Sequence, residues 1–275
     1  MNKFLFLLLI IFYNFIYSQS DLIKQSEYAD SLFHSQDYFD AIKEYKRLIF
    51  FDKENSLQFY SYNQIAKCYK YGGKFEDSYN YFSLALIAAK SYREIFDSKI
   101  NICRLNILEK KTKNAHRILD DLENDSSFSE FFDEIKYWRG WTFYFEMEYQ
   151  KAYEVFNELN KEELAKITKK VLDKTYSVQK SKILSMFLPG AGQFYTGNYL
   201  NGLGSFVWNL LSGYLTINAF ANERLFDGII ISNFLWLRFY KGNIENAEKF
   251  AIQKNQEIFN QSLKLIYSNV NEEIP

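Results

Sequence analysis

The residues that could carry out chemistry in this 275-residue chain are few, and their spacing favours no reaction. Two cysteines and two histidines could act as nucleophiles, proton carriers or metal ligands. Cys68 and Cys103 occupy different positions of a repeated pattern, so we expect two buried free thiols, with a disulfide as the alternative. His34 and His116 lie in or beside predicted turns, with no ligand spacing around them, and we expect both at the surface.

Motifs typical of enzymes do not occur in the sequence. We find no phosphate-binding glycine loop and no nucleophile elbow. Adjacent carboxylates such as Glu162 and Glu163 occur only in ordinary solvated helix contexts. The sequence therefore predicts a non-enzymatic protein with no catalytic residue, metal or cofactor.

The composition defines the class of protein. Hydrophobic residues make up 48% of the chain and charged residues 24%, which is enough apolar material for a sizeable core and excludes a disordered chain. The net charge of −1 gives no general attraction to nucleic acid, so we expect no nucleic-acid partner.

The N-terminus has the pattern of an export signal. Lys3 precedes an apolar run over residues 4–17, which is too short for a comfortable membrane span. We expect a signal peptide at residues 1–18 with cleavage after Ser18, or, as the alternative, an uncleaved anchor. In either case the following chain would lie outside the cytoplasm.

Residues 22–160 repeat with a period of 37 residues. Small residues recur at Ala29, Ala66, Cys103 and Gly140, and again at Ala41, Ser78, Ala115 and Ala152. Large apolar residues follow at Tyr45, Phe82, Leu119 and Phe156. Small side chains let two antiparallel helices approach closely, so the period predicts four stacked helical hairpins.

This pattern resembles the tetratricopeptide repeat, which has small residues at its eighth and twentieth positions and an aromatic at its twenty-fourth, as in Ala29, Ala41 and Tyr45. It departs from that family in its longer period and in lacking the proline at the repeat end. The resemblance implies a groove for a protein or peptide partner, lined by the first helix of each hairpin. The groove positions that we single out are Tyr60, Asn63, Lys67, Lys70, Arg104, Tyr137, Trp141 and Tyr144.

The last three of these residues form an aromatic stripe on one helix face. A peptide-binding hot spot is one interpretation of the stripe, and packing against the following helix is the other. Residues 161–182 are rich in lysine, and we expect a basic helical linker there that either contacts anionic lipid or is simply solvated.

A glycine-rich segment follows the linker. Its motif residues are Pro189, Gly190, Gly192, Gln193, Tyr195, Gly197 and Gly202. Proline and glycine predict a helix break, and Gln193 and Tyr195 could bind the backbone groups that the break frees. Two apolar stretches, residues 203–220 and 225–240, then predict a helical hairpin whose legs are marginal in length for spanning a bilayer.

The motif resembles a widespread bacterial family of small two-helix membrane domains. A later segment, Tyr240 to Asn243 with Ala247, Ala251 and Asn255, is similar to that family's closing segment. The resemblance implies a membrane location and no particular activity.

These observations predict an all-α fold, a tetratricopeptide-like helical-hairpin solenoid followed by a glycine-hinged membrane helical hairpin at residues 183–242. An amphipathic helix and tail at residues 243–275 would close the chain. Asp227 or Arg238 could pair across the hairpin with Asn209 or Gln193. The lysines of the linker would then lie outside, against the positive-inside tendency, so an alternative is two buried helices that close the solenoid.

The function that we expect is a membrane-tethered scaffold of the cell envelope. It would sit in the inner membrane with the repeats on the periplasmic side, and its partners would be membrane lipid and a protein or peptide. The alternative is a membrane-embedded module, such as a lipid-handling or channel-like oligomer, that the repeats regulate.

Overall fold

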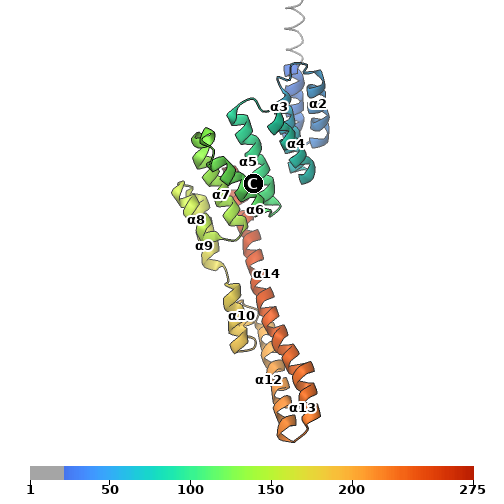
Figure 1. Ribbon diagram of the computed structural model, residues 1–275, viewed down its shortest axis with the longest axis vertical. Helices are drawn as coiled ribbons and strands as arrows, with labels where there is room; N and C mark the ends of the chain where they lie inside the picture. Colours follow the sequence, from blue (N-terminus) through green and yellow to red (C-terminus); the bar gives the residue numbers. More distant parts are fainter. Residues whose placement is uncertain (1–21) are drawn as a thin grey trace, which may run out of the picture. The chain divides into compact units, whose positions relative to one another are not determined.

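The computed structural model describes residues 22–275, so the predicted signal peptide lies outside the described residues. The described chain is helical and contains no strand, which confirms the predicted all-α fold (Figure 1). It divides into two compact units, and the division falls between Leu159 and Asn160. Each unit is described on its own.

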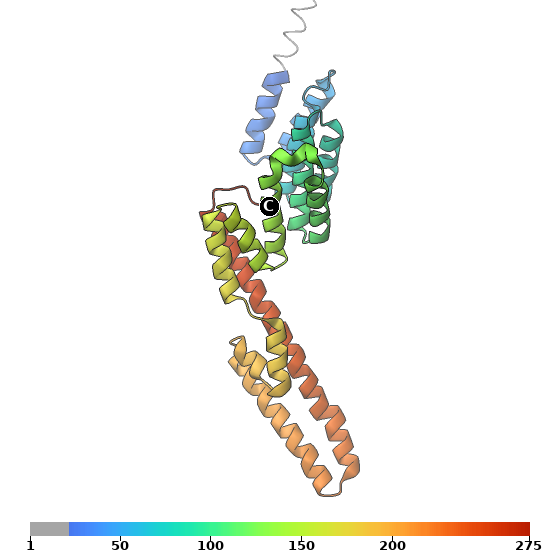
Figure 2. The same cartoon turned by 60° about the vertical axis from the view of Figure 1, so that its left-hand side comes forward.

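The first unit consists of four antiparallel helix pairs with repeat-like packing, which Figure 2 shows from a second side. The pairs are a helix over residues 22–34 with α2 (Tyr38–Phe51), α3 (Gln58–Tyr71) with α4 (Phe75–Ala88), α5 (Tyr92–Leu108) with α6 (Thr112–Glu123), and α7 (Phe132–Phe145) with α8 (Tyr149–Glu158). A 3₁₀-helix, η1 (Ser126–Phe131), precedes α7. Each pair packs against the next, because a single pair cannot bury its own apolar surface.

The small residues of the repeat lie where the two helices of a pair come closest. All eight are buried, and a hydroxyl or thiol replaces the methyl group at two of them. Ser78 Oγ donates a hydrogen bond to the Ala66 carbonyl at 2.8 Å, and the Cys103 thiol approaches the Ala115 carbonyl at 3.8 Å. A Cβ added at Gly140 would lie 2.7 Å from the Phe156 ring. Side-chain size at these positions therefore sets the distance between the two helices within each pair.

The turns inside the pairs repeat as regularly as the core. Positive φ angles occur at Gln36, Gly73, Lys110 and Met147, each 37 residues after the last. The following N–H donates to the carbonyl five residues earlier, as in Lys74 to Tyr69 at 2.9 Å. This left-handed ending closes the first helix and reverses the chain. Only one of the four positions is glycine, so the turn geometry persists without the residue that favours it.

The second unit is built around one long helix, α14 (Leu237–Asn269). The other elements are α9 (Glu162–Lys174), α10 (Val178–Phe187), α11 (Ala191–Tyr195), α12 (Tyr199–Ala221), α13 (Leu225–Ile231) and a π-helical turn, η2 (Ser232–Trp236). Helices α9, α10, α11 and α12 all contact α14. Residues 199–240, which we call the hairpin, reverse at Asn222–Arg224, and their turn end extends past α10 (Figures 1 and 2).

Two expected boundaries are wrong in this unit. The segment predicted as one basic linker is two helices, α9 and α10, and α9 buries Leu164, Ile167 and Val171. The C-terminal helix does not begin at residue 243, because α14 runs without a break through Gly242. An isolated glycine costs a helix only about 1 kcal/mol, which the packing of α14 along four neighbouring helices outweighs.

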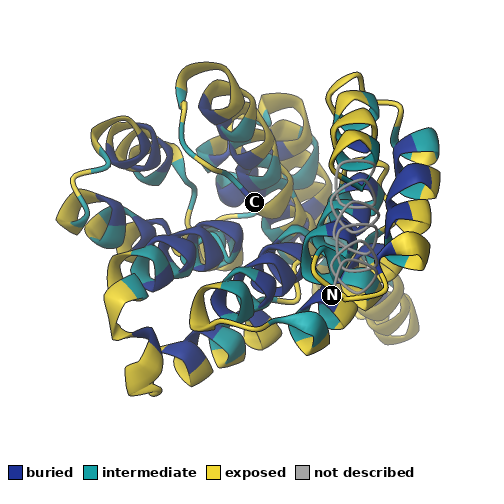
Figure 3. Cartoon of the chain, turned by 90° about the horizontal axis from the view of Figure 1, so that it is seen from above, coloured by how far each residue is buried: buried dark blue, intermediate teal, exposed yellow. Residues whose placement is uncertain are grey.

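Burial follows the helix faces. Buried residues lie on the sides of helices that face other helices, and exposed residues gather at turns and outer sides (Figure 3). Within the second unit the hairpin has a large exposed surface, since Leu200 is 87% exposed and Phe226 is 75% exposed. No helix within residues 22–275 has both the length and the apolar character to cross a membrane.

Candidate functional site

The glycine-rich segment lies at the base of the hairpin, where α10, α11, α12 and α14 meet. Helix α10 ends at Phe187, and the chain turns through Pro189 and Gly190 into the short α11. Gly190 has φ +91°, and a Cβ there would lie 2.2 Å from the carbonyl oxygen of Gly202. The motif therefore needs a residue without a side chain at Gly190, both for its backbone angle and for the approach of α12.

Gly192 brings α11 against α10. A Cβ at this position would lie 2.2 Å from the Ser181 carbonyl oxygen and 2.6 Å from Ser185 Oγ. The Gly192 N–H donates to Ser185 Oγ at 2.9 Å, and Ser181 Oγ donates to the Gly192 carbonyl at 3.1 Å. Gly197 has φ +78° in the turn between α11 and α12, with open space around it.

Gln193 is fully buried and joins three helices. Its Oε1 accepts from Ser185 Oγ at 3.0 Å, and its Nε2 donates to the Asn243 carbonyl at 2.9 Å. Nε2 also lies 3.4 Å from Ser205 Oγ on α12. A buried amide with partners on both its oxygen and its nitrogen is specific for one arrangement of the helices.

Asn243 completes this polar cluster, which we define as Ser181, Ser185, Gln193 and Asn243. Asn243 Oδ1 accepts the Gly190 N–H at 2.8 Å, and its Nδ2 donates to the Ser185 carbonyl at 2.8 Å. Ser181 Oγ also donates to the Ala247 carbonyl at 2.9 Å. Backbone groups that the break at Pro189 leaves open are thus bound by side chains of α10 and α14.

Two further contacts attach α14 to α10 and to the residues that precede α10. Asn255 Oδ1 accepts the Tyr176 N–H at 2.9 Å, and its Nδ2 donates to the Tyr176 carbonyl at 2.8 Å. At the other end of α10, the Tyr240 hydroxyl donates to the Met186 carbonyl at 2.8 Å. Contrary to the prediction, Tyr195 does not bind the backbone at the break; its hydroxyl accepts the Ser177 N–H at 3.2 Å, at the start of α10.

The chemistry of the polar cluster is hydrogen bonding between neutral groups. Serine, asparagine and glutamine side chains do not gain or lose protons at neutral pH, so the cluster holds helices in place and offers no acid or base. The expected pairing of Asp227 or Arg238 with Gln193 or Asn209 is wrong. Asp227 lies 3.7 Å from Arg224, its neighbour on the same turn, and Asn209 Nδ2 donates to the Ser205 and Phe239 carbonyls.

The groove residues that the sequence singles out fall into two groups. Tyr60, Asn63, Lys67 and Lys70 are half-buried and form one stripe along α3. The Tyr60 hydroxyl donates to Asp30, which also accepts from Tyr45 at 2.6 Å, so this ring is held by the preceding pair. The stripe on α3 is the part of the predicted groove that remains accessible.

The second group is packed into the interior. Arg104 is 7% exposed, and its guanidinium lies 4.7 Å from the Trp138 ring. Trp141 and Tyr144 are fully buried, and Tyr137 is 8% exposed. Trp141 packs against Phe156 of α8, with ring centroids 5.7 Å apart. The aromatic stripe of α7 therefore packs against the following helix, and a partner could reach it only after repacking.

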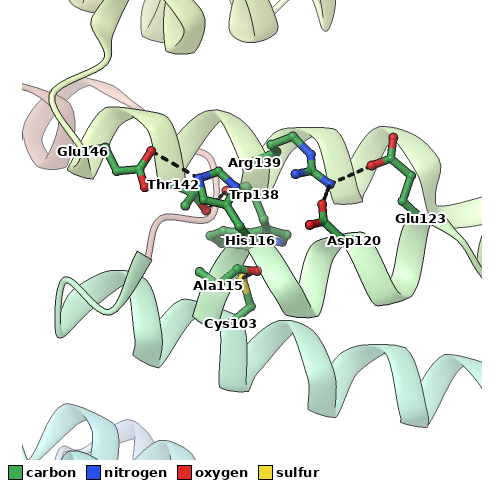
Figure 4. A network of polar contacts seen from close by, with 9 residues as sticks. All are labelled: Cys103, Ala115, His116, Asp120, Glu123, Trp138, Arg139, Thr142 and Glu146. Atoms are coloured by element: carbon green, nitrogen blue, oxygen red, sulfur yellow. Dashed lines mark hydrogen bonds and ion pairs between the residues drawn. The ribbon is translucent and has the colours of Figure 1, made fainter. Parts of the chain in front are cut away.

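Ionisable side chains also gather between α6 and α7 (Figure 4). Arg139 lies 2.9 Å from Asp120 and 2.6 Å from Glu123, and His116 lies 3.2 Å from Glu146. The Cys103 thiol beside them is buried, and burial raises its pKa to about 12. A protonated, inaccessible thiol cannot act as a nucleophile at neutral pH. These ion pairs join neighbouring repeats.

Sequence reasoning missed Ser181 and Ser185, although their spacing of four residues on a lysine-rich helix would place both on the face toward α14. Neither Cys68 nor Cys103 forms a disulfide; both are buried free thiols. Within residues 22–275, no group of three or more His, Cys, Asp or Glu side chains could hold a metal ion. Comparison with known proteins returned no match, either to a family model or to a curated protein.

Proposed function

We propose that this protein is a non-enzymatic membrane scaffold of the cell envelope. In this proposal the hairpin inserts into the lipid of the inner membrane, and the helix pairs of the first unit bind a partner protein on the periplasmic side. The observation that carries the proposal is that the hairpin buries small and polar side chains and exposes large apolar ones.

The buried side of α12 is small and polar. Its buried residues are Gly202, Asn209, Ser212, Gly213, Thr216 and Ala219. The hydroxyls of Ser212 and Thr216 donate to carbonyls one turn earlier, at 2.6 and 2.8 Å. By contrast, α2 of the first unit buries Tyr45 and Leu48. Small and internally bonded side chains between helices are typical of helix pairs in lipid, where apolar side chains gain nothing by turning inward.

The outer side of the hairpin is apolar. Leu210 is 62% exposed, Ile217 is 64% exposed and Phe234 is 74% exposed. Between residues 183 and 237 the only charged residues are Glu223, Arg224 and Asp227, all at the turn end. An exposed apolar surface of this extent favours contact with lipid or with another apolar surface. Trp208 and Trp236 are both partly exposed on the hairpin, and in this proposal they are its aromatic anchors at the interface.

Along α12 this surface extends over 23 residues, or about 34 Å at 1.5 Å per residue. This length is comparable to the hydrocarbon thickness of a bilayer, about 30 Å. The polar side chains of α12 lower its average hydropathy, but those on the inner side would not meet lipid. These features support insertion of the hairpin as a pair of helices rather than of either leg alone.

The membrane part of the proposal is tested with the full chain in cells. We expect the protein to stay in the membrane pellet after a high-pH carbonate wash. The double variant Leu210→Lys with Ile217→Lys should move most of it to the supernatant, because each lysine would have to enter lipid. The control is Ile252→Lys, which changes a similarly exposed residue of α14 outside the apolar region. Recovery of the unchanged protein in the wash would end the proposal.

The partner-binding part concerns the stripe on α3. A photoreactive residue at Asn63 should give one discrete cross-linked product in cells, and reversing two charges with Lys67→Glu and Lys70→Glu should remove it. The same photoreactive residue at Lys113, exposed on α6, is the control position. Equal products from both positions would indicate random contacts and would count against a binding groove.

The alternative, a membrane-embedded module that acts on lipid, is favoured by one observation. A polar pocket lies in the side of the otherwise apolar hairpin. The next subsection develops its chemistry.

A further inference from the structure

The pocket is open, has a volume of about 830 Å³, and is lined by α12, η2 and the first turns of α14. Two glycines face it from opposite walls, Gly204 on α12 and Gly242 on α14. A Cβ added at either position would meet no atom within 4 Å. A larger side chain at either position would therefore occupy part of the pocket.

One wall of the pocket carries positive charge. Arg238 and Lys241 both line it and are both exposed. The structure shows no ion pair between these two side chains and any described residue. Glu245 is the one acidic residue in the lining, so the pocket has a net charge of +1.

The remaining lining combines a flat apolar surface with amides. Trp208 and Phe239 stack with ring centroids 5.4 Å apart. Asn209 is 5% exposed, and its Oδ1 has no hydrogen-bond partner among the described residues. A buried acceptor without a donor is costly, and a ligand hydroxyl reaches this oxygen only after the side chains that cover it move.

We infer that this pocket binds the phosphodiester headgroup of an anionic phospholipid. Arginine pairs with phosphate oxygens through two parallel hydrogen bonds, and a nearby lysine adds a second charge. The pocket is of the size that encloses a small ligand. The exposed apolar residues of the hairpin beside it, such as Leu211, would contact the acyl chains. The inference rests on the proposed insertion of the hairpin into lipid.

The same chemistry selects among headgroups. A phosphoglycerol headgroup has one negative charge and free hydroxyls, which suit the two cations and the asparagine side chains of the lining. A phosphocholine headgroup brings its own cation toward Arg238 and Lys241 and has no hydroxyl to donate. We therefore expect phosphatidylglycerol to bind in preference to phosphatidylcholine.

The test uses the full chain purified in detergent and reconstituted into vesicles of phosphatidylcholine, with or without phosphatidylglycerol. After re-extraction, mass spectrometry counts the phosphatidylglycerol that the protein retains. The double variant Arg238→Gln with Lys241→Gln should retain at least about tenfold less, because two charge-assisted contacts are removed. The control, Lys249→Gln with Lys264→Gln, makes the same charge change elsewhere on α14 and should retain the original amount.

A second variant separates the pocket from general surface charge. Gly204→Leu fills the pocket and leaves every charge in place, so it should also reduce retention. If the amides around the polar cluster exchange hydrogen at the same rate as in the unchanged protein, this variant is folded. If Gly204→Leu retained phosphatidylglycerol fully, or if both double variants lost it equally, the site would be wrong.

Two further measurements identify the source of the ligand and test the insertion of the hairpin separately. Glycerol 1-phosphate in excess should not displace the lipid. Displacement would point to a soluble phosphate compound and overturn the lipid assignment. Flotation with vesicles of phosphatidylcholine alone reports insertion of the hairpin, independently of the headgroup. Flotation without phosphatidylglycerol retention would leave the proposed function standing and reject this inference.

Discussion

A single methyl group at Gly192 should loosen the base of the hairpin. In Gly192→Ala the new Cβ would lie 2.2 Å from the Ser181 carbonyl oxygen, whereas Cβ atoms do not come closer than 3.0 Å to such atoms. Helices α10 and α11 must therefore separate. Ser181 and Ser185 would then lose their hydrogen bonds to Gly192.

The expected cost follows from these two effects. Forcing an extra carbon into a packed site costs roughly 1–3 kcal/mol, and each hydrogen bond that is lost costs about 1 kcal/mol. The better helix propensity of alanine returns about 1 kcal/mol. The free energy of opening should thus fall by about 2 to 4 kcal/mol, which corresponds to amide exchange roughly 30- to 700-fold faster.

Hydrogen exchange measured by mass spectrometry locates the effect. Amides of α10, α11 and the facing part of α14 should exchange faster in Gly192→Ala, while those of α3 to α6 keep their rates. Gly204→Ala is the matched control, because α12 has open space at that position and a helical alanine should be neutral or slightly stabilising. Equal exchange in Gly192→Ala and Gly204→Ala would refute the close approach of α10 and α11.

Two further predictions concern other parts of the chain. Asn255→Ala should destabilise the junction between α9 and α10 by about 2 to 3 kcal/mol, because Tyr176 loses partners for its N–H and its carbonyl. Urea unfolding of this variant beside Gln253→Ala, which changes an exposed residue of α14, measures the cost, and equal midpoints would contradict it. Burial raises the pKa of the Cys103 thiol from 9.0 to about 12, so its contribution to stability is complete below pH 9 and is lost as the pH rises toward 12. Unfolding midpoints should therefore fall more steeply above pH 9 in the unchanged protein than in Cys103→Ala, and iodoacetamide should label Cys103 at pH 8 only as fast as the protein unfolds. Labelling at the rate of an exposed thiol would show that the thiol is accessible.

The sequence was sufficient for the features that depend on local geometry. A helix places residues three and four apart on one face, so the 37-residue recurrence of small and large side chains predicted the helix pairs and their buried columns. The break at Pro189 and Gly190 was equally readable, because it follows from the φ angles that these residues allow. The stripe Tyr137, Trp141 and Tyr144 was predicted to share a face, and spacing alone left open what that face contacts.

Only the tertiary structure decided which side chains meet. Gln193 and Asn243 are fifty residues apart, and nothing in their local sequence selects one as the partner of the other. The continuity of α14 through Gly242 depends on the helices packed along it, and the pocket depends on Gly204 and Gly242 facing the same space. Side-chain periodicity is a property of one helix, whereas contact, burial and cavity shape are properties of several helices packed together, and those arise only when the whole chain has folded.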